Sequence, residues 1–142
     1  MQRIRKSVLV PHSAAQMYNL VERVEDYPKF LPWCGGVEIH ARDAVSLDAT
    51  IRVEFLKAKT FFRTRDLLSE NRIEMQFIDG PFKTLHGQWL FSPLLEDACK
   101  IEFSLDYEFS SRTLEAVIGP VFGRIAATFV DAFIARADTL YG

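Results

Sequence analysis

The residues that are able to do chemistry are few in this sequence, and they are scattered. Its three histidines, His12, His40 and His86, lack the short spacing of metal ligands, so we expect each of them on the surface or in a loop. The chain contains no CxxC, HExxH or nucleophile-elbow motif and no glycine-rich phosphate loop. This pattern favours a protein that uses no metal, no cofactor and no covalent catalysis, and that is not an enzyme.

The two cysteines, Cys34 and Cys99, fit a reducing compartment in which both remain free and buried. No histidine neighbours Cys34 in the sequence, so an inert thiol is favoured over a nucleophile. The early apolar run ends at Pro11, which is too short for a signal peptide, and no stretch approaches the ~20 apolar residues of a membrane span. We therefore expect a cytoplasmic protein whose contact with membranes is at most transient.

A group of basic residues, Lys57, Lys59, Arg63 and Arg65, surrounds a predicted hairpin. Alternate spacing can place several of them on one exposed strand face, where they would protect an edge against aggregation. The alternative interpretation is a site for an anionic partner such as RNA or lipid headgroups. Because the whole chain has a net charge of -2 at pH 7, general electrostatic binding is not favoured and no DNA partner is expected.

The 142 residues correspond to one domain, residues 1–142, and no linker or repeat divides them. Aromatic residues are abundant, with 12 Phe, 4 Tyr and 2 Trp. Such a content indicates either tight aromatic packing in the core or an apolar cavity.

The first third of the chain predicts a strand, a helix and an irregular apolar segment. Residues 3–10 read as a strand, and Ser13 and Gln16 match a capping box at the start of a helix. Two prolines and a glycine pair in residues 27–36 permit at most one helical turn between Pro28 and Pro32. That segment is too apolar for a solvated loop, so it must pack onto another element.

From Val37 onward the hydrophobic pattern has a period of two, which predicts an antiparallel sheet with one apolar face. With the first strand and an expected strand over 59–68, the sheet has about seven strands. The inward positions read as almost entirely apolar. The alternating segments are 37–42, 48–55, 73–77, 85–91 and 101–109.

From Ser111 the pattern returns to helical spacing and predicts a long amphipathic C-terminal helix. Pro120 inside it predicts a kink or break, because proline donates no backbone hydrogen bond. The predicted fold class is α+β, with a curved antiparallel sheet of about seven strands wrapped around this helix. A pocket remains wherever the two do not pack flush.

The segment Tyr27-Pro28-Lys29-Phe30-Leu31-Pro32-Trp33-Cys34 resembles the signature of the coenzyme Q-binding, START-like family of the polyketide cyclase/dehydrase superfamily. The likeness continues through residues 79–91, 107–111 and 132–137, in family order. It implies the helix-grip fold, in agreement with the periodicity. As the chain begins at its first predicted strand, without a mitochondrial presequence, we expect a bacterial member.

The resemblance implies two different functions. One is the non-catalytic binding of ubiquinone or a related isoprenoid quinone, in support of respiration or quinone synthesis. The other is that of a ribosome association toxin of a toxin-antitoxin pair, which binds the large ribosomal subunit and blocks subunit joining. The aromatic content favours the quinone, because burial of each CH₂ of its tail contributes about 0.8 kcal/mol. A third function in this superfamily, that of a cyclase or aromatase, needs an acid or base inside the cavity, and the apolar inward positions argue against it.

The expected ligand site lies between the sheet and the C-terminal helix, where a few polar groups would meet the quinone oxygens. Four residues of the irregular segment are expected to close its mouth: Tyr27, Phe30, Leu31 and Trp33. The expected wall residues are Phe55, Phe77, Trp89, Phe103, Tyr107, Phe122, Phe129 and Phe133.

Overall fold

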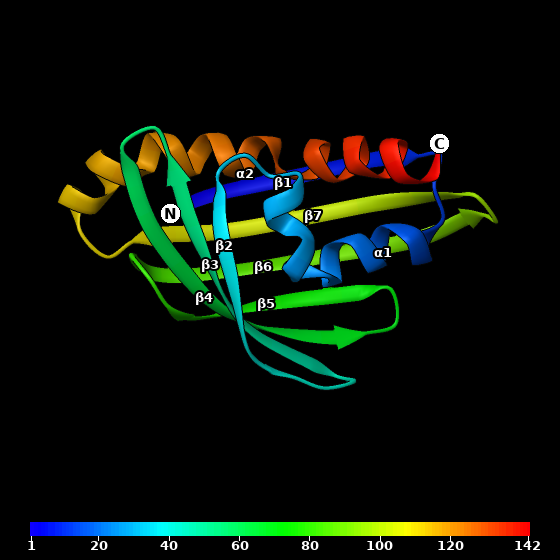
Figure 1. The fold of residues 1–142 in the computed structure, drawn as a ribbon, viewed down its shortest axis with the longest axis horizontal. Helices are drawn as coiled ribbons and strands as arrows, with labels where there is room; N and C mark the ends of the chain where they lie inside the picture. Colours follow the sequence, from blue (N-terminus) through cyan, green and yellow to red (C-terminus); the bar gives the residue numbers. More distant parts are fainter.

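The computed structural model describes residues 1–142 and contains one seven-stranded antiparallel sheet (Figure 1). Strands that follow one another in the chain are neighbours, except that β1 pairs with β7, so that the order is β1-β7-β6-β5-β4-β3-β2. The strands are β1 (Gln2–Val10), β2 (Cys34–Arg42), β3 (Ser46–Phe55), β4 (Ala58–Ser69), β5 (Arg72–Asp79), β6 (Phe82–Leu95) and β7 (Ala98–Phe109).

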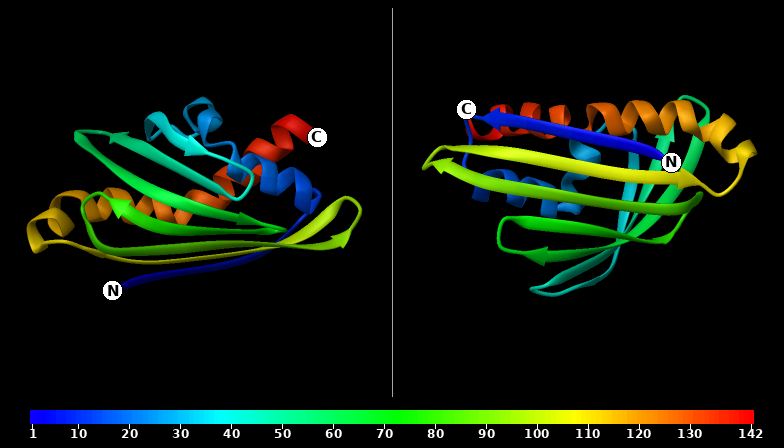
Figure 2. Two further views of the ribbon diagram at one scale, coloured as in Figure 1. Left: turned by 90° about the horizontal axis from the view of Figure 1, so that it is seen from below. Right: turned by 180° about the vertical axis from the view of Figure 1, so that it is seen from behind.

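The remaining elements are two α-helices and a 3-10 helix: α1 (Ala14–Glu22), η1 (Val24–Lys29) and α2 (Arg112–Tyr141). Figure 2 shows that the sheet is strongly curved and that α2 runs along its concave side. This arrangement confirms the predicted α+β helix-grip fold, including the strand that was expected over 59–68.

The strict alternation of β7 builds the floor of the core. Every second residue from Cys99 to Phe109 is buried, and the residues between them are half-exposed. β2 departs from the expected alternation, because Ile39 and Ala41 are exposed and Val37 is only half-buried. This strand is at the edge of the sheet, and its pairing with β3 shifts register twice. The register shifts interrupt the alternation, so the period of two in the sequence did not identify a buried face here.

The segment before β2 packs into the core, as expected. The capping box of α1 is present, with Gln16 N donating to Ser13 Oγ and Ser13 N donating to Gln16 Oε1, each at 3.1 Å. η1 ends at Lys29, so no helical turn lies between the two prolines. Tyr27, Leu31 and Trp33 are buried, and this burial explains why the irregular segment is so apolar.

α2 is continuous from Arg112 to Tyr141, so Pro120 does not break the helix, and of the two expected outcomes only a kink at Pro120 stays a prediction. Only one backbone hydrogen bond is lost at a proline, and the buried face on both sides of it holds the helix against the sheet. The expectation that no stretch is apolar enough for a membrane span is wrong for α2, which meets that criterion by length and composition, with 33% of an 18-residue apolar stretch buried in the fold. The buried residues of the helix are Ile118, Phe122, Ile125, Ala126, Val130, Phe133 and Ala137.

Two sequence expectations about polar or reactive side chains agree with the structure. Cys34 and Cys99 are free and buried, as expected. His12 lies in a loop, the one after β1, as expected, but its side chain is only 4% exposed. Its imidazole contacts Asp138 near the end of α2, which supplies the polar partner that a buried histidine requires.

Candidate functional site

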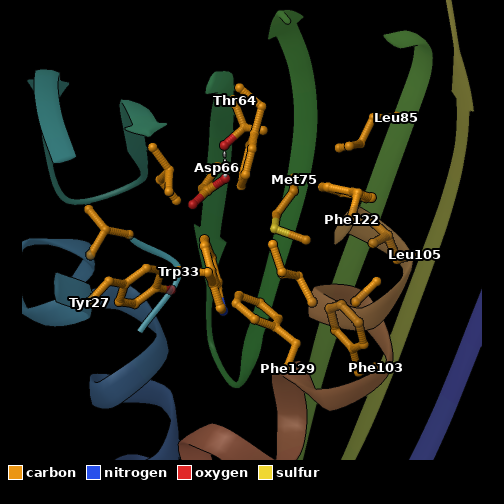
Figure 3. Close-up of a pocket in the computed structure, with 15 residues that line it drawn as sticks. Tyr27, Trp33, Thr64, Asp66, Met75, Leu85, Phe103, Leu105, Phe122 and Phe129 are labelled. Carbon is orange, nitrogen blue, oxygen red and sulfur yellow. Dashed lines mark hydrogen bonds between the residues drawn. The ribbon is translucent and has the colours of Figure 1, made fainter. Parts of the chain in front are cut away.

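A cavity lies between the concave face of the sheet and α2 (Figure 3). It is lined by 15 residues, of which 13 are hydrophobic. They come from η1, the segment after it, strands β3 to β7 and the middle of α2. The lining residues are Val24, Tyr27, Trp33, Ile51, Phe62, Thr64, Asp66, Met75, Leu85, Phe103, Leu105, Phe122, Ile125, Ala126 and Phe129.

Five of the residues predicted to bind a ligand line this cavity: Tyr27, Trp33, Phe103, Phe122 and Phe129. They come from three separate parts of the chain, and only the fold brings them together. The phenol of Tyr27 points away from the cavity centre toward α1, because its hydroxyl donates to the Val21 carbonyl oxygen at 2.5 Å. Tyr27 therefore contributes its ring to the lining, and its hydroxyl is already satisfied.

Six other predicted residues pack in or against the core without lining the cavity: Leu31, Phe30, Phe77, Trp89, Tyr107 and Phe133. Trp89 is fully buried, and its ring lies 4.6 Å from that of Phe103 and 5.7 Å from that of Phe129. It supports two lining residues from behind. Tyr107 has the same relation to Phe122, with ring centroids 4.8 Å apart.

The twelfth predicted residue, Phe55, lies in a second, outer groove. This groove has a volume of about 220 Å³, and it is lined by Pro32, Trp33, Phe55, Val121, Arg124, Ile125 and Thr128. Trp33 and Ile125 line both the groove and the inner cavity. These two side chains therefore form the wall between the cavity and the outside.

The inner cavity contains a carboxyl group that the sequence analysis missed. Asp66 is on β4 and only 9% exposed, and its Oδ1 accepts a hydrogen bond of 3.1 Å from Thr64 Oγ1. Figure 3 shows the two side chains next to each other on β4. The sequence contained a signal for this carboxyl: on the expected strand, Asp66 is two residues after Thr64, so both side chains point to the same, buried face of the sheet.

No Lys, Arg or His is among the lining residues, so Asp66 has no counter-ion in the cavity. The pKa of Asp66 is therefore raised from its ordinary value of 3.8 to about 7, mainly by burial and to a smaller extent by the negative charges of Asp48 and Glu22. The hydrogen bond from Thr64 acts in the opposite direction. Near neutral pH this carboxyl is protonated in much of the population and can then donate a hydrogen bond. The expectation of an almost entirely apolar interior holds for the walls and fails at this position.

The inner cavity itself is small, with a volume of about 50 Å³. Sites for drug-sized ligands usually have volumes of about 300 Å³ or more. A quinone with an isoprenoid tail needs more room than this, so Trp33, Ile125 or both must move before such a molecule can enter. Because these two side chains also line the groove, their displacement would join the two spaces.

The basic residues near the β3–β4 hairpin do not form a uniformly positive face. Lys59, Arg63 and Arg65 are on the outer face of β4, and Lys57 is in the turn. Arg63 forms two hydrogen bonds with Asp48, of 2.8 and 2.7 Å, and is therefore already paired. Lys59 lies opposite Glu54 in the register. The exposed positive charge of this face comes mainly from Lys57, Lys59 and Arg65.

No group of three or more His, Cys, Asp or Glu side chains is placed to hold a metal ion. The two lining residues that are not hydrophobic, Asp66 and Thr64, supply one carboxyl and one hydroxyl to the cavity, and the Tyr27 hydroxyl is already bonded to Val21. This arrangement can bind a mostly apolar molecule and form a hydrogen bond with one of its polar atoms.

A comparison with known protein families agrees with this geometry. The family model described as "Polyketide cyclase / dehydrase and lipid transport" matches residues 10–134. The chain belongs to this family.

Two curated relatives represent the two functions that the resemblance implied. The ribosome association toxin RatA of Escherichia coli K12 is 44% identical over 142 residues, which cover 99% of this chain and 90% of the toxin. A mitochondrial coenzyme Q-binding protein of Drosophila melanogaster is 28% identical over 134 residues, which cover 91% of this chain and 55% of that protein.

Solved structures share the fold over nearly the whole chain. An 18 kDa protein from Caulobacter crescentus is 33% identical, with a TM-score of 0.71 and coverage of 100% of this chain and 99% of the other. The Zhui aromatase/cyclase from a Streptomyces species has a TM-score of 0.81 and covers 96% of this chain and 93% of its own. At 16% identity, the second comparison establishes the likeness of fold alone.

Proposed function

We propose that this protein binds a quinone or a related isoprenoid lipid between its sheet and α2, without transforming it. The observation that carries the proposal is an apolar cavity next to an outer groove, with Trp33 and Ile125 lining both spaces. The inner cavity takes the ring of the ligand, and the outer groove takes the first part of its tail. The family description includes lipid transport, and the Drosophila relative is named for binding coenzyme Q.

The absence of catalysis is part of this proposal. Acid-base catalysis commonly uses one group that removes a proton and another that supplies one, each within hydrogen-bond reach of its own reacting atom. Here the two polar side chains are adjacent on one strand and are hydrogen-bonded to each other, and the other 13 lining residues are hydrophobic. The pair is suited to binding a polar atom of the ligand.

The ligand test is mass spectrometry of an organic extract of the purified protein, followed by titration with ubiquinone. We expect an isoprenoid compound in the extract and saturable quenching of the fluorescence of Trp33 and Trp89 by added quinone. An extract without any isoprenoid lipid, together with no saturable quenching, would contradict the proposal.

A second function is favoured by a specific observation, the 44% identity with RatA over almost the whole chain. In this function the protein binds the large ribosomal subunit through the outer face of β4 and the neighbouring turn. The exposed Lys57, Lys59 and Arg65 would contact RNA phosphates there, which makes the binding sensitive to salt. The ligand cavity lies on the other face of the sheet, so the two functions use different surfaces.

Charge reversal separates the two functions. The triple variant Lys57→Glu, Lys59→Glu, Arg65→Glu leaves Arg63 with Asp48 and should retain quinone binding. A matched control reverses Arg3, Lys83 and Lys100, three exposed or half-exposed bases on β1, β6 and β7. If wild-type protein co-sediments with large subunits in a salt-dependent way, and only the first variant loses this, the ribosome function stands.

We also propose a cytoplasmic location. Cys34 and Cys99 are free, and the pKa of each thiol is raised by burial, as expected of inert thiols in a reducing compartment. Fractionation of cells that express the protein at its native level tests this location.

A further inference from the structure

Asp66 has no structural role that explains its burial. It forms no ion pair, and its one hydrogen bond is accepted from Thr64, the next inward residue on the same strand. A buried carboxyl without a counter-ion destabilises a fold, and an apolar side chain of similar size would pack in its place without that penalty. Such groups occur preferentially where a protein meets a ligand.

The chemistry around Asp66 defines what it can recognise. The hydroxyl of Thr64 uses its proton on Oδ1, so Oδ2 is the oxygen left for a ligand. A protonated carboxyl donates to a carbonyl oxygen, and the aromatic rings of Phe103, Phe122 and Phe129 complete an apolar lining for a flat ring. The site therefore suits a ring that carries a carbonyl group and has no charge.

The position of Trp33 and Ile125 between the cavity and the groove determines the orientation of the bound ligand. Asp66 lines the inner cavity and is absent from the outer groove, whereas Trp33 and Ile125 line both. A molecule with one polar end that enters from the groove brings that end to Asp66 by moving in ring first. Its apolar chain then remains between Phe55 and Val121, which line the groove only.

We propose that Asp66, positioned by Thr64, is the hydrogen-bonding anchor for the carbonyl-bearing ring of the ligand, which enters ring first and leaves its apolar chain in the outer groove. This inference rests on the proposed function and adds to it the recognised group, the residue that recognises it and the orientation. Phe103, Phe122 and Phe129 are the rings that surround the bound carbonyl compound.

The test compares two probes by equilibrium dialysis. One is ubiquinone with two isoprene units, and the other is an arene of the same size and tail without a carbonyl group. We expect wild-type protein to prefer the quinone, and Asp66→Val to bind the quinone about tenfold more weakly, the effect of one lost hydrogen bond. Arene binding should be unchanged. Thr60→Val, which removes a hydroxyl from the same face of β4 outside the cavity, is the control and should not alter quinone binding.

A second variant tests the proton on Asp66. Asp66→Asn keeps a hydrogen-bond donor, so it should retain the preference for the quinone. Wild-type affinity should fall as the pH rises from about 6 to about 8.5, because a deprotonated carboxylate repels the carbonyl oxygen, and the Asn variant should show no such fall. The titratable groups electrostatically coupled to Asp66 are Asp48 of β3, Glu22 of α1 and Tyr27 of η1, and all of them are retained in both proteins.

The outcomes distinguish the anchor from the binding function. The proposed role of Asp66 is wrong if Asp66→Val binds the quinone as tightly as wild type does, or if wild type binds both probes equally. In either case the proposed binding of an apolar ligand in the cavity is retained. If wild-type protein binds neither probe, the proposed function fails, and the anchor fails with it.

Discussion

His12 Nε2 lies 2.6 Å from Asp138 Oδ1, and this contact joins the loop after β1 to the last turns of α2. The two residues differ in environment, since the side chain of His12 is 4% exposed and that of Asp138 is 59% exposed. The contact therefore has its main energetic effect at the histidine, which has no solvent to replace the carboxylate.

We predict that Asp138→Ala lowers the free energy of unfolding by about 1–3 kcal/mol, because it leaves a buried imidazole nitrogen without a partner. Asp131→Ala is the matched control. Asp131 is also 59% exposed on α2, but its partner Lys6 is on the surface, so we expect a loss of at most about 1 kcal/mol. Chemical denaturation of both variants measures the difference, and equal losses would contradict the prediction.

Asp66 makes the stability of the protein depend on pH in a direction opposite to that of most carboxylates. Its pKa is about 7 in the folded protein and 3.8 ordinarily, so between these values the folded state holds the proton that the unfolded state has released. The contribution of Asp66 to stability therefore falls as the pH rises through this range, by about 4 kcal/mol in total.

We predict that Asp66→Asn removes this loss. Relative to wild type, the variant should gain stability steadily from about pH 4 to about pH 8 and change little above that. The Asn side-chain oxygen can still accept the hydroxyl proton of Thr64, so the local hydrogen bond is retained. Urea denaturation at several pH values measures the difference between the two proteins, and a constant difference would show that Asp66 is not buried as described.

Ile125 separates the inner cavity from the outer groove, and its truncation should open a path between them. We predict that Ile125→Ala takes up a quinone faster than wild type does in a stopped-flow quenching experiment. Val130→Ala is the matched control, because Val130 is also buried on α2 but lines neither space. Both variants lose core packing, so faster uptake in both would point to general loosening rather than to the wall.

Leu56 at the β3–β4 turn has a positive φ of 57° and is 86% exposed. The other non-glycine residue with a positive φ is Asn71, in the β4–β5 turn, where the side chain suits the left-handed conformation. We predict that Leu56→Asn raises the free energy of unfolding by about 0.5–1 kcal/mol, since it relieves this strain and removes little packing. Thermal unfolding is the measurement. Leu56→Ala keeps the backbone strain and should leave the stability nearly unchanged.

The local patterns in the sequence determined the architecture. The alternation along β7 and β3, the capping box of Ser13 and the helical spacing after Ser111 each depend on neighbouring residues, and each is found in the structure. The apolar character of residues 27–33 indicated that the segment is packed, because its side chains have no favourable place in solvent. These features led directly to a curved sheet around one long helix.

The tertiary structure decided which residues of each apolar face line the cavity and which pack into the core. Trp89 and Phe103 are large, inward and adjacent across β6 and β7, yet only Phe103 lines the cavity. The difference arises from the curvature of the sheet and the position of α2, and neither is encoded in the spacing of one strand. For the same reason the sequence predicted only a strand over 59–68, and the assembled fold was needed to show that the carboxyl of Asp66 on this strand is enclosed without a counter-ion.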